Sequence, residues 1–268
     1  MTLELVGYFS AIFMGLSLGM IGGGGSILTV PILVYLFNID PTLATAYSLF
    51  VVGLTALFGG FNYYKRGEVD LKTGFIFATP SFIGVYLIRS FVIPNLPVEI
   101  AHIGNLVLTK SLLIMLLFAV LMVVASISMI RSKKSETKKK EFSPTTRMLI
   151  IGLEGLVVGG VTGFVGAGGG FLIIPALVIL VGLPMKIAVG TSLFIIAAKS
   201  LLGFIGDVQH QPYIDWMMLL KIASIAIVGL FVGVKLSDKV SEKTLKKGFG
   251  YFVLVMGTFI LIDQLRKM

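Results

Sequence analysis

Apolar segments long enough to cross a lipid bilayer recur along the whole chain. Crossing about 30 Å of hydrocarbon takes roughly 20 apolar residues in a helix. Hydrophobic residues make up 56% of the 268 positions and charged residues only 13%, so too little polar surface remains to cover a soluble core. We therefore expect an all-α, polytopic membrane protein. Its apolar segments run over residues 4–21, 26–37, 42–61, 71–92, 109–130, 148–165, 170–183, 187–206, 215–236 and 247–263.

The basic residues gather between these segments. Of 22 Lys and Arg residues, seven lie in residues 131–147 and five in residues 235–247. Short basic loops are typical of the cytoplasmic side of membrane proteins. Attraction to anionic lipid is a second interpretation of the net charge of +9, and nucleic acid or phosphate binding is the least favoured. The first ten residues lack a basic region and a cleavage site, so we expect them to begin the first membrane helix rather than a signal peptide.

Two of the apolar segments are too short to cross the membrane as straight helices. A helix rises about 1.5 Å per residue, so segment 26–37 reaches only about 18 Å. Both short segments, 26–37 and 170–183, directly follow a glycine run: GGGG at residues 22–25 and GAGGG at residues 166–170. The sequence leaves open whether these segments span the membrane or re-enter it.

The matching positions of the glycine runs reveal an internal repeat. A shift of 144 residues aligns residues 15–59 with residues 159–203, and 16 of these 45 pairs are identical. Shared hydrophobicity alone would not align Pro31 with Pro175 or the Ser-Leu-Phe runs that begin at Ser48 and Ser192, so chance similarity is the weaker interpretation. We expect a first transmembrane repeat over residues 1–130, a basic cytoplasmic linker over 131–147 and a second transmembrane repeat over 148–268.

The charge distribution predicts that the two repeats are inverted. Each contains five apolar elements, an odd number, so the second starts on the opposite side if all five cross. With the central basic loop in the cytoplasm, 16 Lys and Arg residues fall on that side and five on the outer side. The loop after the third element carries Lys65 and Arg66, whereas its counterpart at residues 207–215 has no basic residue. We therefore expect inverted topology with both termini outside.

The glycine runs also predict a binding site near the middle of the membrane. Irregular backbone survives in a bilayer only where protein or a water-filled cavity surrounds it. Short, glycine-interrupted segments at matching positions of inverted halves indicate a transporter's binding site. Helices that start near Ser26 and Phe171 would offer unpaired N–H groups and partial positive charge to an anion. Close helix packing through small residues is the alternative role of these glycines.

Hydroxyl groups complete the predicted site. Tyr47 and Ser48 have Thr191 and Ser192 as their repeat counterparts, although each of these hydroxyls could instead bond to its own helix. The residues that we expect to bind the substrate are Gly22, Gly23, Gly24, Gly25, Ser26, Thr29 and Ser48 from the first repeat, with Thr162, Gly166, Gly168, Gly169, Gly170, Thr191, Ser192 and Lys199 from the second.

Two charged residues lie well inside apolar segments. Lys199 is a functional candidate because an intramembrane charge costs at least about 2.5 kcal/mol to insert. It could balance the charge of a dianion, or extend to the membrane interface. Glu154 could carry an exchanged proton, or pair with Lys199. The aspartates Asp40, Asp70, Asp207 and Asp215 lie at segment ends and are expected to be caps or interface residues.

The glycine runs and the segments that follow them resemble a known family. The stretches GLSLGMIGGGGSILTVPIL with ATAYSLF, and GGVTGFVGAGGGFLIIPAL with AVGTSLF, are similar to the paired signature of the TauE/SafE sulfite exporter family, as is the loop NYYKRGEVD. The resemblance covers nearly the whole chain. It implies a bacterial-type inner-membrane carrier that moves small sulfur-containing anions, usually outward. The counterpart loop GDVQHQPYID lacks the basic–glycine pattern, so a gating role of Lys65 and Arg66 would have no symmetric partner.

These observations favour a secondary transporter that exports sulfite or organosulfonates by alternating access, with proton coupling as the simplest energy source. An importer or channel for a related anion such as sulfate is the alternative. An intramembrane sulfur-metabolism enzyme is least favoured, because the sequence has no cysteine, no His, Asp and Glu metal set and no Ser–His arrangement. We expect no cofactor, no metal and no nucleic acid. The expected partners are the anion, protons and the bilayer, and the oligomeric state stays open.

Overall fold

The computed structural model confirms a helical, polytopic membrane protein and adds one small β-hairpin. It describes residues 2–103, 106–131, 144–166, 168–179, 181–210, 213–237, 239 and 241–266. The expected cytoplasmic linker lies mostly outside the described residues. The first half contains α1 (Thr2–Ile21), η1 (Gly23–Leu28), α2 (Thr29–Pro31), η2 (Ile32–Leu36), α3 (Pro41–Lys65), α4 (Leu71–Leu87), η3 (Ile88–Val92), α5 (Ile93–Asn95), β1 (Glu99–Ile103), β2 (Leu106–Thr109) and α6 (Lys110–Arg131). The second contains α7 (Pro144–Val165), α8 (Gly170–Ile179), α9 (Met185–Val208), α10 (Trp216–Ser237) and α11 (Glu242–Arg266).

Seven helices in the described part of the chain are long and apolar enough to cross a membrane. They are α1, α3, α4 with its continuation to Asn95, α6, α7, α9 and α10. Side chains that would face lipid are large and apolar, among them Phe9, Phe13, Val157, Val228 and Phe259. The chain is therefore a multi-pass membrane protein.

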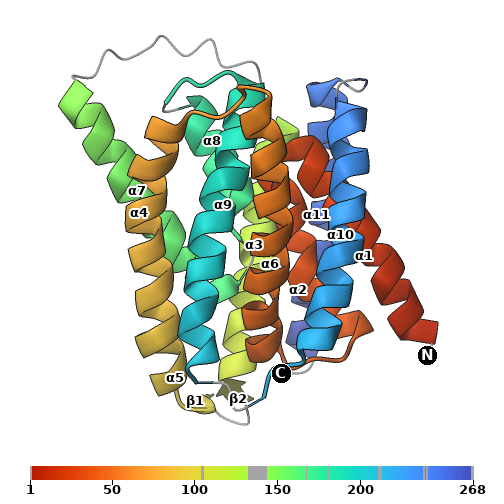
Figure 1. Cartoon of the computed structure of the whole chain (residues 1–268). Coiled ribbons are helices and arrows are strands. Elements are labelled where there is room, and N and C mark those ends of the chain that lie inside the picture. The colour runs from red at the N-terminus through yellow and green to blue at the C-terminus, as the bar shows by residue number, and fades with distance from the viewer. Residues whose placement is uncertain are drawn as a thin grey trace.

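The two short segments are the returning arms of helical hairpins. In Figure 1, α1 begins at the bottom, where both termini lie, and the chain returns through α2 toward that same end. Helix α7 begins at the top of the picture and α8 leads back to the top. Helix α8 has ten residues, which rise about 15 Å, so it reaches only part of the way across a bilayer. Glycines at the bends allow this reversal inside the protein.

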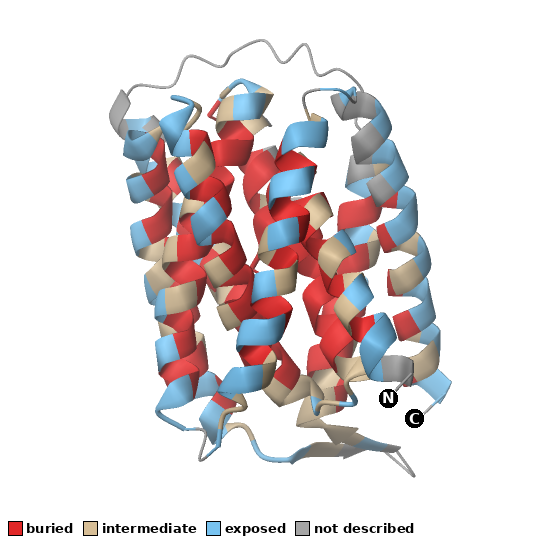
Figure 2. Ribbon diagram, turned by 45° about the vertical axis from the view of Figure 1, so that its right-hand side comes forward, coloured by how far each residue is buried: buried red, intermediate tan, exposed pale blue. Residues whose placement is uncertain are grey.

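Helices α3 and α9 form the centre of the bundle. In each, 72% of the membrane-spanning window is buried, against 33–44% in the other five helices of spanning length. Figure 2 shows the buried residues on the inward faces of the helices and the exposed residues around the outside. Because the hairpins pack against α3 and α9, the two central helices hold the glycine bends in the interior.

Helices at matching positions of the two halves make reciprocal contacts. Helix α1 packs on α10 as α7 packs on α4, and α3 and α9 pack on each other, as do α6 and α11. The glycines at which the backbones of neighbouring helices come close also occupy matching positions in the two halves. A β-carbon on Gly15 would collide with the backbone of Ala226, and one on Gly159 with the backbone of Ser81. This reciprocity is what two halves related by an approximate two-fold axis would produce.

Aspartate caps fix the start of three helices. The amide N–H of Thr42 donates to Asp40 Oδ1 at 2.8 Å, and that of Thr73 donates to Asp70 Oδ1 at 3.0 Å. Asp215 caps α10 in the same way by accepting from the amide of Met218 at 2.9 Å. These carboxylates satisfy amides that have no partner in the first turn of a helix. The expectation of a cap or interface role is met for these three residues but is wrong for Asp207.

Candidate functional site

The two hairpin bends meet in the interior. Gly22 and Gly166 occupy equivalent repeat positions, with φ of 76° and 73°, a backbone conformation that favours glycine. A β-carbon on Gly23 would collide with Gly170 Cα, and one on Gly170 with Gly23 Cα, so the backbones of the two bends touch. We call residues 22–26 the first glycine turn, and Gly166 with residues 168–170 the second glycine turn. Their contact joins the two halves in the interior.

Side chains of the opposite half pack tightly over each turn. A β-carbon on Gly22 would lie 2.9 Å from Ser192 Oγ and 3.0 Å from Ile174 Cδ1. One on Gly168 would lie 3.2 Å from Ser26 Cβ. The described surroundings of the turns are therefore closely packed.

Lys199 lies against the second glycine turn. It is fully buried, and its Nζ donates to Thr162 Oγ1 at 2.6 Å. A β-carbon on Gly169 would lie 2.8 Å from Lys199 Nζ. The side chain therefore does not extend to a membrane interface. Its repeat counterpart is the neutral Thr55, so this cation belongs to one half only.

The candidate serines and threonines differ in their hydrogen bonds. Ser26 Oγ donates to Gly23 O at 2.7 Å, and Ser192 Oγ donates to Val189 O at 2.7 Å, so both bond back to their own helical segment. Thr29 Oγ1 contacts Met14 Sδ at 2.7 Å. Ser48 Oγ is buried and has no hydrogen-bond partner. Of this group, Ser48 alone has an unused hydroxyl to offer a ligand.

The hydroxyl groups of Tyr47 and Thr191 instead accept hydrogen bonds from residues of the loops. The amide N–H of Asp215 donates to Tyr47 Oη at 2.9 Å, and the amide of Asp70 donates to Thr191 Oγ1 at 2.9 Å. Each bond joins a central helix of one half to a capping aspartate of the other half. We call these two bonds the loop latches. The candidates Tyr47 and Thr191 are thus engaged at opposite ends of the bundle.

We predict that the latches act independently. Removing the hydroxyl in Tyr47→Phe should cost about 1 kcal/mol and should speed amide hydrogen exchange at Asp215 while leaving that at Asp70 unchanged. Thr191→Val should produce the reverse pattern. Hydrogen exchange followed by mass spectrometry on the purified protein checks both, and equal acceleration at the two aspartates in either variant would contradict separate latches.

Glu154 lies apart from Lys199. It is partly buried on α7, and its Oε2 has no hydrogen-bond partner. Within the described residues, Lys199 bonds to Thr162, which lies eight positions further along α7, and no ion pair joins it to Glu154. A pairing of Glu154 with Lys199 is therefore excluded in this conformation. The described residues hold no group of three or more His, Asp or Glu side chains that could bind a metal.

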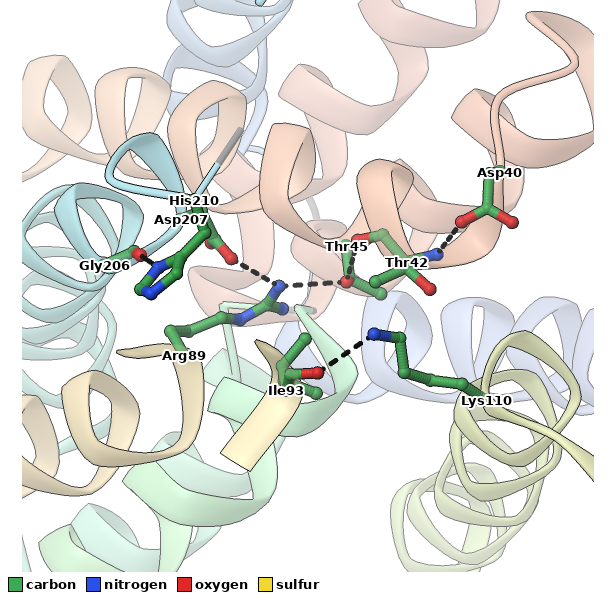
Figure 3. Close-up of polar contacts among 9 residues, drawn as sticks. All are labelled: Asp40, Thr42, Thr45, Arg89, Ile93, Lys110, Gly206, Asp207 and His210. Atoms are coloured by element: carbon green, nitrogen blue, oxygen red, sulfur yellow. Dashed lines mark hydrogen bonds and ion pairs between the residues drawn. The ribbon is translucent and has the colours of Figure 1, made fainter. Parts of the chain in front are cut away.

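A buried ion pair that the sequence did not indicate lies toward the β-hairpin end. Arg89 Nη1 contacts Asp207 Oδ1 at 3.2 Å, and the side chains are 0% and 5% exposed (Figure 3). Asp207 was expected to be a cap or interface residue, but its side chain instead pairs with Arg89 in the interior. The one available signal was that both residues lie near the same end of neighbouring apolar segments.

A separate cavity opens at the β-hairpin end. It has a volume of about 490 Å³ and lies between η2, the start of α3, β2 and the start of α6. Tyr35, Asn38, Asp40 and Ser111 supply polar groups to its wall, and Gln264 of α11 closes one side. None of its lining residues belongs to the glycine turns.

Comparisons with known proteins agree on one family. The family described as "Sulfite exporter TauE/SafE" matches residues 8–260. A "Probable membrane transporter protein" of Xylella fastidiosa is 28% identical over 251 residues, covering 92% of this chain and 90% of the relative. YdhB of Bacillus subtilis is 28% identical over 255 residues, with 92% and 96% covered, and MJ0441 of Methanocaldococcus jannaschii is 26% identical over 271 residues, with 94% of each covered. Both carry the same printed description. No solved structure matches.

Proposed function

Because this chain belongs to the sulfite exporter TauE/SafE family, we propose that it exports small sulfur-containing anions, sulfite or organosulfonates, as a secondary active transporter. Its place is a bacterial-type inner membrane. The family and the printed names of its relatives make it a membrane transporter. The substrate, the direction of transport and the coupling to protons are our inference.

One observation carries the proposal: the buried Lys199 lies against the second glycine turn, and the backbone of that turn touches the first glycine turn in the interior. A dry site with a fixed cation and nearby backbone amides is suited to a small anion, because the interaction is strong where water is excluded. The unpartnered hydroxyl of Ser48 adds a donor from the other half. Glycine at these positions lets an anion approach the backbone itself.

Alternating access follows from an inverted repeat. The reciprocal packing of α1 on α10 and of α7 on α4 supports such a relation between the halves. The tight packing over both turns corresponds to an occluded state, which rocking of one half against the other would open to either side in turn. The loop latches at opposite ends are the contacts that we expect to break alternately.

The basic residues at the two ends of the helical bundle determine the orientation that we propose for the protein in the membrane. The helix ends at the top of Figure 1 carry four lysines: Lys65, Lys72, Lys186 and Lys235. The helix ends beside the β-hairpin carry Lys110 and Arg266. Excess basic residues favour the cytoplasm for the first end. Export then runs from the basic end toward the β-hairpin.

Flux measurements in proteoliposomes test the proposal. We expect labelled sulfite or methanesulfonate to accumulate against its own gradient when a pH gradient is imposed, and to equilibrate without accumulation when the gradient is dissipated. Uptake of sulfate in preference to sulfite and sulfonates would favour an importer for inorganic anions. Flux that follows membrane voltage alone, without accumulation, would favour a channel.

Glu154→Gln tests the proton coupling. The amide keeps the shape of the side chain but cannot release a proton, so we expect the pH dependence of transport to flatten while flux down a substrate gradient persists. Glu68→Gln, at the loop after α3, is the matched control and should keep the pH profile. An unchanged pH profile in Glu154→Gln would remove Glu154 from the proton pathway.

A further inference from the structure

Arg89 is buried with three of the five N–H groups of its guanidinium unused. The residue is 1% exposed, and Nη1 alone makes its contacts, to Asp207 Oδ1 at 3.2 Å and to Thr45 Oγ1 at 3.1 Å. Its Nε and Nη2 are buried and have no partner. These two nitrogens form one edge of the planar guanidinium, the edge that donates two parallel hydrogen bonds to two oxygens of one oxyanion. Buried donors are rarely left unpaired without a functional reason.

The groups around Arg89 are also incompletely paired. Asp207 Oδ2 and Ser90 Oγ are buried without a partner. Arg89 and Ser90 belong to the π-helical turn η3, and such turns are frequent at functional sites. Helix α9 comes very close at this point, since a β-carbon on Gly206 would lie 2.8 Å from Ser90 Oγ. Figure 3 shows Arg89 between Asp207 and Thr45, which come from different helices.

Thr45 connects this cluster to the second glycine turn. A β-carbon on Gly166 would collide with the backbone of Thr45, whose side chain bonds to Arg89. At the same turn, the amide of Gly166 donates to Thr162 O at 2.7 Å, and the hydroxyl of Thr162 accepts from Lys199. Two buried cations therefore lie near the second glycine turn. Lys199 lies beside Gly169, and Arg89 bonds to Thr45, which lies beside Gly166.

We propose that Arg89 forms a second anion-binding site, on the β-hairpin side of the glycine turns, in which its Nε–Nη2 edge binds two oxygens of an oxyanion and Ser90 donates a third hydrogen bond. This inference rests on the proposed function and adds a second binding site along the path of the substrate. Because Asp207 already neutralises Arg89, an arriving anion competes with this carboxylate. Asp207 thereby keeps the site weak enough to release the anion toward the outside.

Binding measurements on variants of each partner of the ion pair, Arg89 and Asp207, test the site. The experiment uses the purified full-length protein in detergent and isothermal titration calorimetry with methanesulfonate. Arg89→Lys keeps the positive charge but cannot donate two parallel bonds, so we expect binding to weaken about tenfold. Asp207→Asn removes the competing carboxylate, so we expect binding to strengthen severalfold. Arg266→Lys, an exposed arginine at the same end of the bundle, should leave the affinity unchanged.

The opposite directions distinguish a binding site from a structural ion pair. Both single variants alter the same ion pair, so a purely structural role would shift the affinity in the same direction in both, or in neither, and either result would overturn the proposal. The double variant Arg89→Gln with Asp207→Asn replaces the ions with two amides of similar size. We expect it to keep the thermal stability of the wild type yet to bind methanesulfonate as weakly as Arg89→Lys.

Failure of this inference and failure of the proposed function give different results. Arg89-dependent binding of methanesulfonate without flux of sulfite or sulfonates would support the second site and remove the proposed function. Flux and binding that are both unchanged in Arg89→Lys would remove the second site and leave the proposed function in place. No binding of methanesulfonate by the wild type would overturn the second site.

Discussion

Gly170→Leu is expected to abolish anion flux while the protein still inserts into the membrane. The β-carbon would collide with Gly23 Cα in the other half and would lie 2.6 Å from Ile196 Cδ1. Backbone cannot yield as a flexible side chain can, so the two glycine turns would be forced apart and their amides would no longer surround one space. The apolar segments that direct insertion stay intact. Flux in proteoliposomes, normalised to the amount of inserted protein, measures the effect.

Gly160→Leu is the matched control. It lies on α7, ten positions before Gly170, and a β-carbon there meets nothing within 4 Å. Leucine is also a better helix former than glycine. We expect Gly160→Leu to transport at the wild-type rate. Normal flux in Gly170→Leu, or equal losses in both variants, would contradict the assignment of the glycine turns. Gly168→Leu offers a second test, since its β-carbon would lie 2.7 Å from Val52 Cγ1.

Lys199→Met is expected to lower flux by about ten- to hundredfold without destabilising the fold. A hydrogen bond to a charged group contributes about 1.5–3 kcal/mol, and about 1.4 kcal/mol corresponds to a factor of ten. Methionine fills a similar volume, and replacing a buried charge by an apolar side chain is often neutral or stabilising. Flux and thermal unfolding, measured on the same preparations, separate the two effects.

Thr162→Val separates the charge of Lys199 from its hydrogen bond. This variant removes the acceptor of the 2.6 Å bond and keeps the ammonium group, so we expect a smaller loss of flux than in Lys199→Met. Lys221→Met, at an exposed position of α10, should have no effect. Equal losses of stability and flux in Lys199→Met would make the lysine a structural residue.

The sequence predicted the membrane helices well because hydrophobicity decides where they lie. The expected segment 42–61 corresponds to α3 (Pro41–Lys65), and segment 109–130 to α6 (Lys110–Arg131). The glycine runs correctly marked where the chain bends. The paired strands β1 (Glu99–Ile103) and β2 (Leu106–Thr109) were not predicted, because they lie between membrane segments, where the length of an apolar run carries no information about strands.

The polar contacts were less predictable because they join distant parts of the chain. The bonds of Asp70 to Thr191 and of Asp215 to Tyr47 span 121 and 168 positions. The repeat identified Tyr47 and Thr191 as a matched pair, but their partners come from loops of the opposite half. Arg89 and Asp207 are 118 positions apart with no repeat relation between them, and the packing of α4 and η3 against α9 brings them together.

Location of a bound anion tests the central claim most directly. Selenite has the shape and charge chemistry of sulfite, and its selenium can be located by anomalous diffraction from crystals of the full-length protein. We predict a selenium peak between residues 22–26 and 166–170, within hydrogen-bonding distance of the turn amides and close to Lys199 Nζ. Selenium peaks confined to the basic end, with both turns still packed against Ser192 and Thr45, would contradict the claim that the glycine turns form the binding site.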